Sequence, residues 1–324
     1  MSYILVTGGA GYIGSKVSID LLDKGYKVII IDNLSSGYKK LIDPRAIFFK
    51  LEISDSNKVF AILKKYNIKT IFHFAASVSV PESAKNPYKY IKNNIFATEN
   101  LLKQAVKNKI RNFIFSSSCS VYGESKNFCV RENFPKIPKS NYALTKFFCE
   151  NLIQNYSYFY KFNFAILRYF NVIGADILLR SGQIYDGPLI KTISKNIVRN
   201  KLKVNIYGKE YKTVDGTCIR DYIDVNDLSE IHILAFKKIN DKKKSLIFNC
   251  GYGKPLSVLN IINEFEKIIG KKIKKRFVKK RPGDVSAIYA NNKTLKRTFP
   301  FWRSKNNLKS SIKSSLNWEK KLIK

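Results

Sequence analysis

Tyr142 and Lys146 are the residues whose types and spacing best suit acid–base chemistry. They stand four residues apart in a segment whose apolar periodicity predicts a helix over residues 142–158, so their side chains share one helix face. A phenol has a pKa of about 10 and is a poor base at neutral pH, but a neighbouring ammonium group or another positive charge favours the phenolate. We therefore predict that Tyr142 acts as a general base with Lys146 beside it.

A serine-rich strand end strengthens this prediction. Ser116, Ser117 and Ser118 follow an apolar run at residues 112–115, and Ser118 stands 24 residues before Tyr142. Doubly wound sheets bind ligands at the carboxyl edge of their strands, so we expect Ser118 to hydrogen-bond the hydroxyl on which Tyr142 acts. The YxxxK spacing alone occurs by chance in a chain with 19 tyrosines. It gains weight from this strand end and from a glycine-rich turn near the N-terminus.

Gly8, Gly11 and Gly14 belong to that turn, which joins an apolar run at residues 3–7 to a helical pattern. Glycines let the backbone approach a pyrophosphate, whose charge is met by the N–H groups and the positive dipole end of the following helix. Asp32 ends the next apolar run 18 residues after Gly14. There a carboxylate accepts hydrogen bonds from an adenosine ribose and repels the 2′-phosphate of NADP. The motif therefore predicts an NAD site.

The elements that must position these residues alternate between strand and helix. Strands are predicted over residues 3–7, 27–31, 70–74, 112–115 and 164–168, and helices over 13–24, 94–106 and 142–158. This alternation predicts an α/β fold, a Rossmann-type doubly wound parallel sheet with helices on both faces.

The alternation of strand and helix patterns becomes less regular in the second half of the chain. We expect an NAD-binding Rossmann domain at residues 1–172 and a smaller C-terminal α/β substrate domain at 173–324. Residues 222–236 have a helical pattern and 245–249 a strand pattern, so 219–251 is expected to rejoin the first sheet in part.

Composition narrows the class of protein. A chain of 324 residues with 45% hydrophobic residues buries a full core without disulfides. No apolar run approaches the roughly 20 residues of a membrane span, the N-terminus lacks a signal-peptide pattern, and the five cysteines are scattered. We therefore expect a cytoplasmic protein with reduced thiols and no membrane partner.

The net charge of +35 does not indicate nucleic acid as a partner. The excess lysines are spread over many predicted helix surfaces, which is typical of a solvated surface that also attracts anionic substrates. His73 and His232 lack a carboxylate cluster at ligand spacing, so no metal is expected. Cys119 lies near the proposed site, but no adjacent group would lower its pKa, and we expect no catalytic role for it.

Eight motifs together carry a specific resemblance. They are TGGAGYIGS (7–15), DN (32–33), HFAA (73–76), FSSSCSVYG (115–123), YALTK (142–146), RYFN (168–171), DGTCIRDYIDVNDL (215–228) and RPGD (281–284). On these motifs the chain resembles the extended short-chain dehydrogenase/reductases, and within them the UDP-galactose 4-epimerases, also called UDP-glucose 4-epimerases, over nearly its whole length.

The resemblance implies roles for individual residues. The implied catalytic set is Ser118, Tyr142 and Lys146. The residues implied to hold NAD are Gly8, Gly11, Tyr12, Ile13, Gly14, Asp32, Asn33, Glu52, Ile53, Phe74, Ala75, Ala76, Asn93, Ser116, Tyr142, Lys146 and Tyr169. The residues implied to hold a UDP-sugar, most of them in the second domain, are Ser118, Tyr142, Asn171, Leu189, Tyr207, Arg220, Arg281 and Asp284. Forked arginine donors suit a pyrophosphate, and an aromatic ring such as that of Tyr207 packs on uracil.

The implied activity is that of an isomerase with tightly bound NAD. It inverts C4 of a UDP-hexose through a transient 4-keto intermediate, with UDP-glucose/UDP-galactose interconversion as the first expectation. A homodimer is also implied, through helices near residues 95–107 and 145–160. Dehydratases of this fold carry an Asp–Glu pair where this chain has Cys119 and Ser120, so elimination of water is not expected.

Several alternatives stay open from the sequence. Ile288 falls where the resemblance places a residue that limits bulk at the sugar 2-position, so an N-acetylated or 6-carboxylated sugar remains possible as substrate. Val78, Glu52 and Pro188 depart from the usual Lys, Asp, and Asn or His at their positions. A non-catalytic nucleotide- or RNA-binding protein is the alternative from another class.

Overall fold

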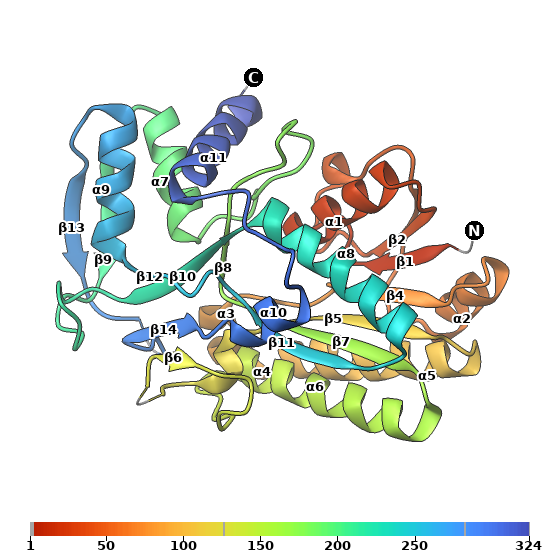
Figure 1. Ribbon diagram of the computed structural model, residues 1–324. Coiled ribbons are helices and arrows are strands. Elements are labelled where there is room, and N and C mark those ends of the chain that lie inside the picture. The colour runs from red at the N-terminus through yellow and green to blue at the C-terminus, as the bar shows by residue number, and fades with distance from the viewer. Residues whose placement is uncertain (1–2, 126, 282, 324) are drawn as a thin grey trace. The chain divides into compact units, whose positions relative to one another are not determined.

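The computed structural model describes residues 3–125, 127–281 and 283–323, and it divides the chain into two units. Unit 1 comprises the chain up to Val121, Lys136–Arg168 and Ser229–Phe248, and unit 2 comprises Tyr122–Pro135, Tyr169–Leu228 and the chain from Asn249 onward. Each unit is built from segments that are far apart in the sequence (Figure 1).

The division differs from the domain boundary expected at residue 172. Residues 122–135 belong to unit 2 because β6 (Cys129–Val130) pairs in parallel with β14 (Ala287–Ala290). Residues 229–248 belong to unit 1, in line with the expectation that part of 219–251 rejoins the first sheet. There the ring of Phe236 packs edge-on against Phe72 at 5.7 Å and Tyr26 at 5.8 Å.

A seven-stranded sheet organises unit 1. Its strands are β1 (Ile4–Thr7), β2 (Val28–Asp32), β3 (Ile47–Lys50), β4 (Thr70–His73), β5 (Asn112–Ser118), β7 (Asn163–Tyr169) and β11 (Leu246–Cys250). The order is β11-β7-β5-β4-β1-β2-β3. The pairs β3–β2, β2–β1, β1–β4 and β4–β5 are all parallel. The predicted α/β Rossmann-type fold is confirmed, and the strand order reverses between β1 and β4.

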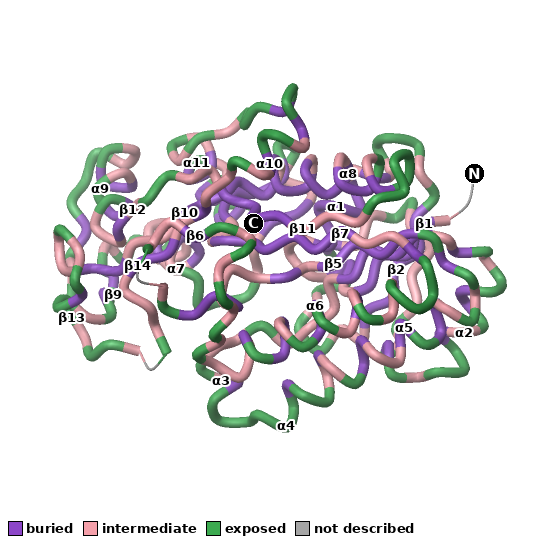
Figure 2. The backbone as a smooth tube through the Cα atoms, turned by 60° about the horizontal axis from the view of Figure 1, so that its bottom comes forward, coloured by how far each residue is buried: buried purple, intermediate pink, exposed green. Residues whose placement is uncertain are grey.

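Helices cover both faces of this sheet. They are α1 (Tyr12–Asp23), α2 (Ser56–Lys65), α3 (Val80–Lys85), α4 (Pro87–Tyr90), α5 (Ala97–Lys107), α6 (Asn141–Tyr160) and α8 (Val225–Lys242). Figure 1 shows α1 and α8 on one face and α2, α5 and α6 on the other. The strands are buried on both sides, with Leu5, Ile29 and Phe113 fully buried, which explains their continuous apolar runs (Figure 2).

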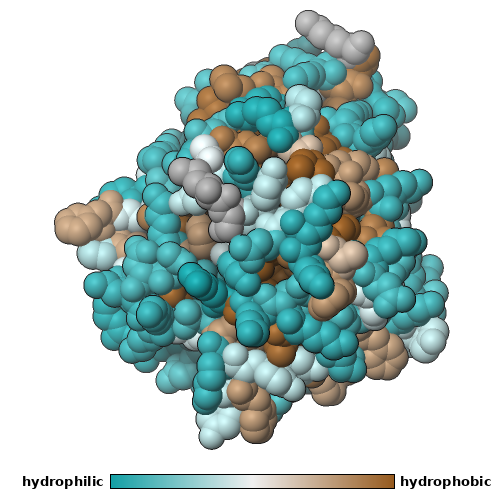
Figure 3. Space-filling model, turned by 90° about the vertical axis from the view of Figure 1, so that its right-hand side faces the viewer, coloured by the Kyte–Doolittle hydropathy of each residue, from teal (hydrophilic) through white to brown (hydrophobic). Residues whose placement is uncertain are grey.

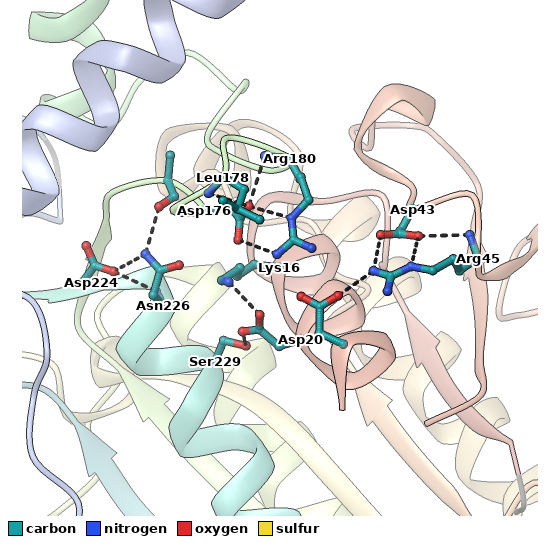
Figure 4. A network of polar contacts seen from close by, with 12 residues as sticks. Lys16, Asp20, Asp43, Arg45, Asp176, Leu178, Arg180, Asp224, Asn226 and Ser229 are labelled. Carbon is teal, nitrogen blue, oxygen red and sulfur yellow. Dashed lines mark hydrogen bonds and ion pairs between the residues drawn. The ribbon is translucent and has the colours of Figure 1, made fainter. Parts of the chain in front are cut away.

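Polar contacts fix α8 against α1 within unit 1. Lys16 Nζ donates to Asp20 Oδ1 at 2.7 Å, and Ser229 Oγ donates to Asp20 Oδ2 at 2.6 Å (Figure 4). Asp20 therefore joins the two helices through Oδ2, while Oδ1 accepts Lys16 of its own helix.

Two expected elements differ in the structure. The helix expected over 94–106 is α5 preceded by a π-helical segment, η2 (Ile91–Phe96). The wider turn leaves Asn94 buried, where its amide bonds the backbone of Ser77 and the hydroxyl of Thr145. The helical pattern expected over 222–236 begins instead with strand residues, because Tyr222–Asp224 closes β10 in parallel pairing with β8.

Unit 2 contains two smaller sheets. Their strands are β6, β8 (Asn171–Ile173), β9 (Lys203–Tyr207), β10 (Ile219–Asp224), β12 (Pro255–Ser257), β13 (Lys274–Val278) and β14. The larger sheet has the order β12-β10-β14-β6, with β8 also on β10, and β9 pairs with β13. The helices are α7 (Leu189–Val198), α9 (Val258–Ile269), α10 (Lys293–Thr298) and α11 (Leu308–Ile323).

A buried ion pair joins α7 to α11. Lys191 Nζ contacts Glu319 Oε1 at 2.5 Å, and each side chain is 5% exposed. Trp318 lies on the same helix and donates its indole N–H to the carbonyl of Gln183 at 3.0 Å. These contacts hold the C-terminal helix in unit 2.

One face of the molecule is mainly hydrophilic. Figure 3 shows one face on which hydrophilic side chains predominate, with apolar side chains scattered among them. Within the described residues, no helix has the length and apolar composition needed to cross a membrane. Among residues 3–125, 127–281 and 283–323, the structure shows no group of three or more His, Cys, Asp or Glu side chains that could bind a metal ion.

Candidate active site

The glycine turn lies at the point where the strand order reverses. Gly8 has a φ of 72°, and a β-carbon there would lie 2.5 Å from the backbone nitrogen of Ala75, which follows β4. A β-carbon on Gly14 would lie 2.3 Å from the carbonyl oxygen of Gly8. Only glycine fits these positions, because the loop after β4 meets the turn at Gly8 and the turn folds back on itself at Gly14.

The start of α1 is suited to an anion. Gly11 is its N-cap, no side chain caps it, and its first turn contains no acidic residue. The positive end of the helix dipole is therefore not compensated by this chain's own side chains. The glycine cradle and this helix end fit the diphosphate of a dinucleotide.

Asp32 is held close to the glycine turn. Its Oδ2 accepts the N–H of Ala10 at 3.0 Å, and its Oδ1 accepts the N–H of Leu34 at 2.8 Å. Burial raises the pKa of this carboxyl, and the two backbone donors oppose that effect. Asn33 donates its amide to Glu52 Oε1 at 2.9 Å, so three of the residues expected to hold adenosine lie together at the ends of β2 and β3.

Most of the other residues of unit 1 that are expected to hold the cofactor lie near the end of β4, whereas Ile53 lies in the core. Phe74, Ala75 and Ala76 follow β4 directly, and the Asn93 amide donates to Ser77 Oγ at 3.0 Å. Ile53 is different, because its side chain packs in the apolar core. Any contact it makes with a cofactor therefore comes from its backbone or an edge of the side chain.

The serine strand end meets α6. The helix begins after Ser140, whose hydroxyl accepts the N–H of Ala143 at 3.2 Å. Lys146 Nζ donates to the carbonyl oxygen of Ser116 at 2.7 Å and lies 4.9 Å from the centre of the Phe115 ring. The structure therefore brings the predicted lysine to the end of β5.

The hydroxyl of Ser118 lies near the phenol of Tyr142. Burial raises the pKa of Tyr142, and the nearby Ser118 hydroxyl opposes that effect. Ser118 in turn accepts the hydroxyl of Ser120 at 2.9 Å and its N–H at 3.2 Å. Two donors of Ser120 therefore hold the Ser118 hydroxyl at the end of β5.

The pKa values of Tyr142 and Lys146 differ from the expectation that Lys146 favours the phenolate of Tyr142. Burial raises the pKa of Tyr142 to about 12, against the opposing effect of Ser118. Burial also lowers the pKa of Lys146 to about 8. The protein alone therefore does not hold Tyr142 as a phenolate. The reason is that desolvation of the buried phenol outweighs its neighbours, while the ammonium group of Lys146 is bonded to the Ser116 carbonyl.

His73 has a structural place in unit 1. Its ring nitrogens bond Thr7 Oγ1 at 2.6 Å and Thr98 Oγ1 at 2.8 Å. Burial and the charge of Lys146 lower its pKa to about 3. The ring is therefore neutral at physiological pH and joins β4 to β1 and α5.

The expected substrate residues of unit 2 form two pairs. The guanidinium carbon of Arg281 lies 3.7 Å from the centre of the Tyr207 ring. Arg220 Nη2 lies 3.8 Å from Asp284 Oδ1, and its Nη1 donates to the carbonyl of Ile219 at 2.8 Å. Tyr207 is 38% exposed. One ring face of Tyr207 is thus already covered by Arg281, so any packing on a base uses the other face.

The remaining expected residues of unit 2 lie on separate elements. Asn171 begins β8, Leu189 begins α7 with Pro188 as its N-cap, and Tyr169 is buried at the end of β7. Ile288 is 3% exposed and faces Arg220 across the β10–β14 pairing.

Glu150 was missed by the sequence analysis. Its carboxylate lies on the α6 face that also bears Lys146, and it is 1% exposed. It accepts the Ser117 hydroxyl at 2.5 Å and pairs with Arg168 at 2.6 Å. A signal was present, because Glu150 stands four residues after Lys146 and continues the 142, 146 series.

Comparison with known proteins agrees with this geometry. The model of the NAD dependent epimerase/dehydratase family matches residues 4–251. The UDP-glucose 4-epimerase of Azospirillum brasilense is 34% identical over 321 residues, which cover 98% of this chain and 92% of that protein.

Two solved structures extend the likeness to the fold. The UDP-glucose 4-epimerase from Brucella ovis in complex with NAD has a TM-score of 0.93 and 32% identity, covering 99% of each chain. The UDP-Glc/GlcNAc 4-epimerase from Campylobacter jejuni has a TM-score of 0.85 and 35% identity, covering 99% of this chain and 100% of the other. The resemblance inferred from the motifs is confirmed, and this chain belongs to the NAD-dependent epimerase/dehydratase family.

Proposed function

We propose that this enzyme is an NAD-containing isomerase that inverts C4 of a UDP-hexose, with UDP-glucose and UDP-galactose as its substrates. The observation that carries the proposal is the meeting of α6 with the serine-rich end of β5, where Lys146 Nζ donates to the carbonyl of Ser116 and the Ser118 hydroxyl lies near the phenol of Tyr142. This arrangement holds a proton acceptor and its donors in one place, as general base catalysis on a hydroxyl requires.

The residues of unit 1 divide the work between them. Tyr142 accepts the proton of the sugar 4-hydroxyl and later returns it. Ser118 orients that hydroxyl, and Lys146 supplies a positive charge at the ribose side. NAD, when bound, supplies a reversible hydride acceptor and a positive charge that favours the phenolate. That charge is needed, because burial raises the pKa of Tyr142 to about 12 in the protein alone.

In unit 2, Arg220 and Arg281 are proposed to bind the diphosphate, and Tyr207 the uracil. Forked guanidinium donors match phosphate oxygens geometrically. Each arginine has a neighbour in unit 2, Asp284 for Arg220 and the ring of Tyr207 for Arg281. Asn171 and Leu189 are proposed as further contacts to the same substrate.

Epimerisation is favoured over dehydration, the other reaction in the family name. The positions after Ser118 hold Cys119 and Ser120. Ser120 donates to Ser118 at 2.9 Å rather than presenting a carboxyl group. Elimination of water needs a general acid at this place, and neither side chain provides one.

A second candidate substrate is UDP-N-acetylglucosamine. The Campylobacter relative acts on both UDP-Glc and UDP-GlcNAc according to its name. Ile288, which the family resemblance places beside the sugar 2-position, is intermediate in size. UDP-glucuronate, a 6-carboxylated sugar, is a further alternative with less support.

Product analysis tests the proposal. Purified protein is incubated with UDP-galactose without added NAD, and UDP-glucose is measured by chromatography. Conversion supports tightly bound NAD and C4 inversion, whereas no conversion by protein loaded with NAD contradicts the proposed activity. A parallel panel with UDP-N-acetylglucosamine and UDP-glucuronate decides among the substrates.

We also propose a homodimer in the cytoplasm. Several large apolar side chains on α4, η2 and α6 are exposed, namely Tyr88, Phe96, Leu144, Phe148, Tyr158 and Phe159, and a second copy of this face would bury them. The cysteines at 119, 129, 149, 218 and 250 are free thiols, as in a reducing compartment.

Light scattering after size-exclusion chromatography tests the dimer. Phe148→Asp places a charge on this face and should shift the mass from dimer to monomer. Phe301→Asp is the control, because Phe301 is 96% exposed and lies outside these helices. A monomeric wild-type protein contradicts the dimer.

A further inference from the structure

Glu150 is the centre of a buried polar network in unit 1. Arg168 of β7 binds both of its carboxylate oxygens, with Nε at 2.9 Å from Oε1 and Nη2 at 2.6 Å from Oε2. Ser117 of β5 donates to Oε1 at 2.5 Å. The side chains of Glu150 and Arg168 are 1% and 3% exposed. One carboxylate on α6 therefore fixes the ends of two neighbouring strands, which lie against this helix (Figure 1).

This network is continuous with the proposed catalytic residues. Tyr142, Lys146 and Glu150 succeed one another at one-turn intervals on α6, and each faces a different residue of the strand end. Tyr142 lies near Ser118, Lys146 donates to the Ser116 carbonyl, and Glu150 accepts the Ser117 hydroxyl. Three consecutive strand residues are thus registered against three turns of one helix, and only the Glu150 contact also reaches a second strand.

The charges around Lys146 give Glu150 a second effect. Among the described groups that interact with Lys146, Cys149 and Glu150 lie on its own helix, and His73 lies on β4. His73 is neutral, because its pKa is lowered to about 3, and the pKa of the Cys149 thiol is raised to about 11 by burial. Cys149 and Glu150 are the neighbours that favour the protonated form of Lys146. Because the thiol is neutral at physiological pH, the carboxylate of Glu150, which Arg168 also binds, is the negative charge beside Lys146.

We propose that Glu150 is a positioning residue for the reaction: through Ser117 it sets the strand end that carries Ser118, and through its charge it keeps Lys146 protonated. This inference rests on the proposed function for the roles of Ser118 and Lys146. Arg168 completes the arrangement by holding the carboxylate in one orientation with two parallel donors. The alternative is that the Glu150–Arg168 pair only stabilises the fold, as a buried ion pair anywhere in the molecule would.

The first measurement is the titration of Lys146 itself. Protein carrying ¹³C at the lysine ε-carbon is followed by NMR from pH 6 to 11, and the Lys146 signal is identified by its loss in Lys146→Arg. In Glu150→Gln the side chain keeps its shape and loses its charge. We expect the Lys146 midpoint to move to lower pH by about 1 or more. The alkaline limb of kcat/KM should move in the same direction.

A matched control is available in unit 2. Glu319→Gln breaks the ion pair with Lys191, whose two side chains are each 5% exposed. It should lower the melting temperature without moving the Lys146 midpoint. Equal midpoints in Glu150→Gln, Glu319→Gln and the wild type would overturn the proposal.

Two more variants separate position from charge and guard against misfolding. Ser117→Ala removes the strand contact and keeps the ion pair, so kcat should fall several-fold with an unchanged Lys146 midpoint; an unchanged kcat overturns the positional role. If Glu150→Gln does not fold, the neutral double variant Glu150→Gln/Arg168→Gln is titrated instead, because replacing both charges avoids an unpaired buried arginine. The NMR titration needs no substrate, so its result stands apart from any failure of the proposed activity.

Discussion

The proposed catalytic residues of unit 1 and the proposed substrate residues of unit 2 are held in different ways. Lys146 and its neighbours Glu150 and Arg168 are at most 3% exposed and are bonded at 2.5–2.9 Å to their partners. Tyr207 is 38% exposed, and the Arg220–Asp284 contact is 3.8 Å long. The comparison teaches that the residues beside the proposed base are fixed in the core, whereas the residues proposed to bind the substrate are more exposed and make longer contacts.

Removing the phenol should have the largest effect. Tyr142→Phe keeps the ring and deletes the proton acceptor, so turnover should fall by about 10²–10⁴-fold, the usual contribution of a general base. NAD released on denaturation should equal that of the wild type. Full activity in this variant would contradict the assignment of Tyr142.

The pH profile should show the titration of Lys146. Burial lowers its pKa to about 8, so the charged form predominates below that pH and is lost as the pH rises through it. We expect kcat/KM to fall about tenfold per pH unit well above pH 8 if the charge is required. Lys146→Arg stays charged over this range. The pH profile of kcat/KM for Lys146→Arg should therefore lack the fall above pH 8, whatever the absolute rate of this variant. If the fall is unchanged, it arises from the titration of a group other than Lys146.

Loss of a phosphate contact in unit 2 should act mainly on binding. Arg220→Ala removes donors to a charged partner, which corresponds to about 1.5–3 kcal/mol, or a rise of about 10–150-fold in KM. The value of kcat should change little. Arg220→Lys keeps the charge without the fork and should recover part of the loss. A fall in kcat with constant KM would place Arg220 with the reacting groups instead.

The smallest effect is expected at Tyr207. The ring of this residue stacks with Arg281 at 3.7 Å, so Tyr207→Phe retains the stacking and should leave KM within about twofold. Tyr207→Ala removes a contact of about 0.5–1 kcal/mol and should raise KM by about 2–5-fold. Equal losses in both variants would show that the hydroxyl, rather than the ring face, binds the substrate.

The sequence was most informative where chemistry depends on local spacing. Gly8 and Gly14 follow β1 at the distances a dinucleotide turn requires, and a β-carbon at either position would clash with backbone. Tyr142 and Lys146 are one helical turn apart, and the helix period alone brings them to one face. Contacts of this kind need only a strand, a turn or a helix, so they can be read without a tertiary structure.

The boundaries of units and strands, and the contacts between residues distant in the chain, were harder to predict from the sequence. The chain enters unit 2 at residues 122–135 because β6 pairs with β14, more than 150 residues later. The strand at Tyr222–Asp224 was mistaken for helix, because β10 reads IRDYID, and its charged residues break the apolar run by which a buried strand is usually identified. The stacking of Arg281 on Tyr207 joins a loop to a strand about 75 positions earlier, and no local pattern encodes such a pair.

The amino-acid sequence by itself determined the fold class, the glycine turn and the order of tyrosine and lysine along one helix, because each follows from residue type and short-range periodicity. Only the tertiary structure decided that desolvation raises the pKa of the phenol to about 12 and that Glu150 meets Ser117 and Arg168. Desolvation and ion pairing depend on what surrounds a group in space, and that environment is assembled from strands and helices distant in the chain.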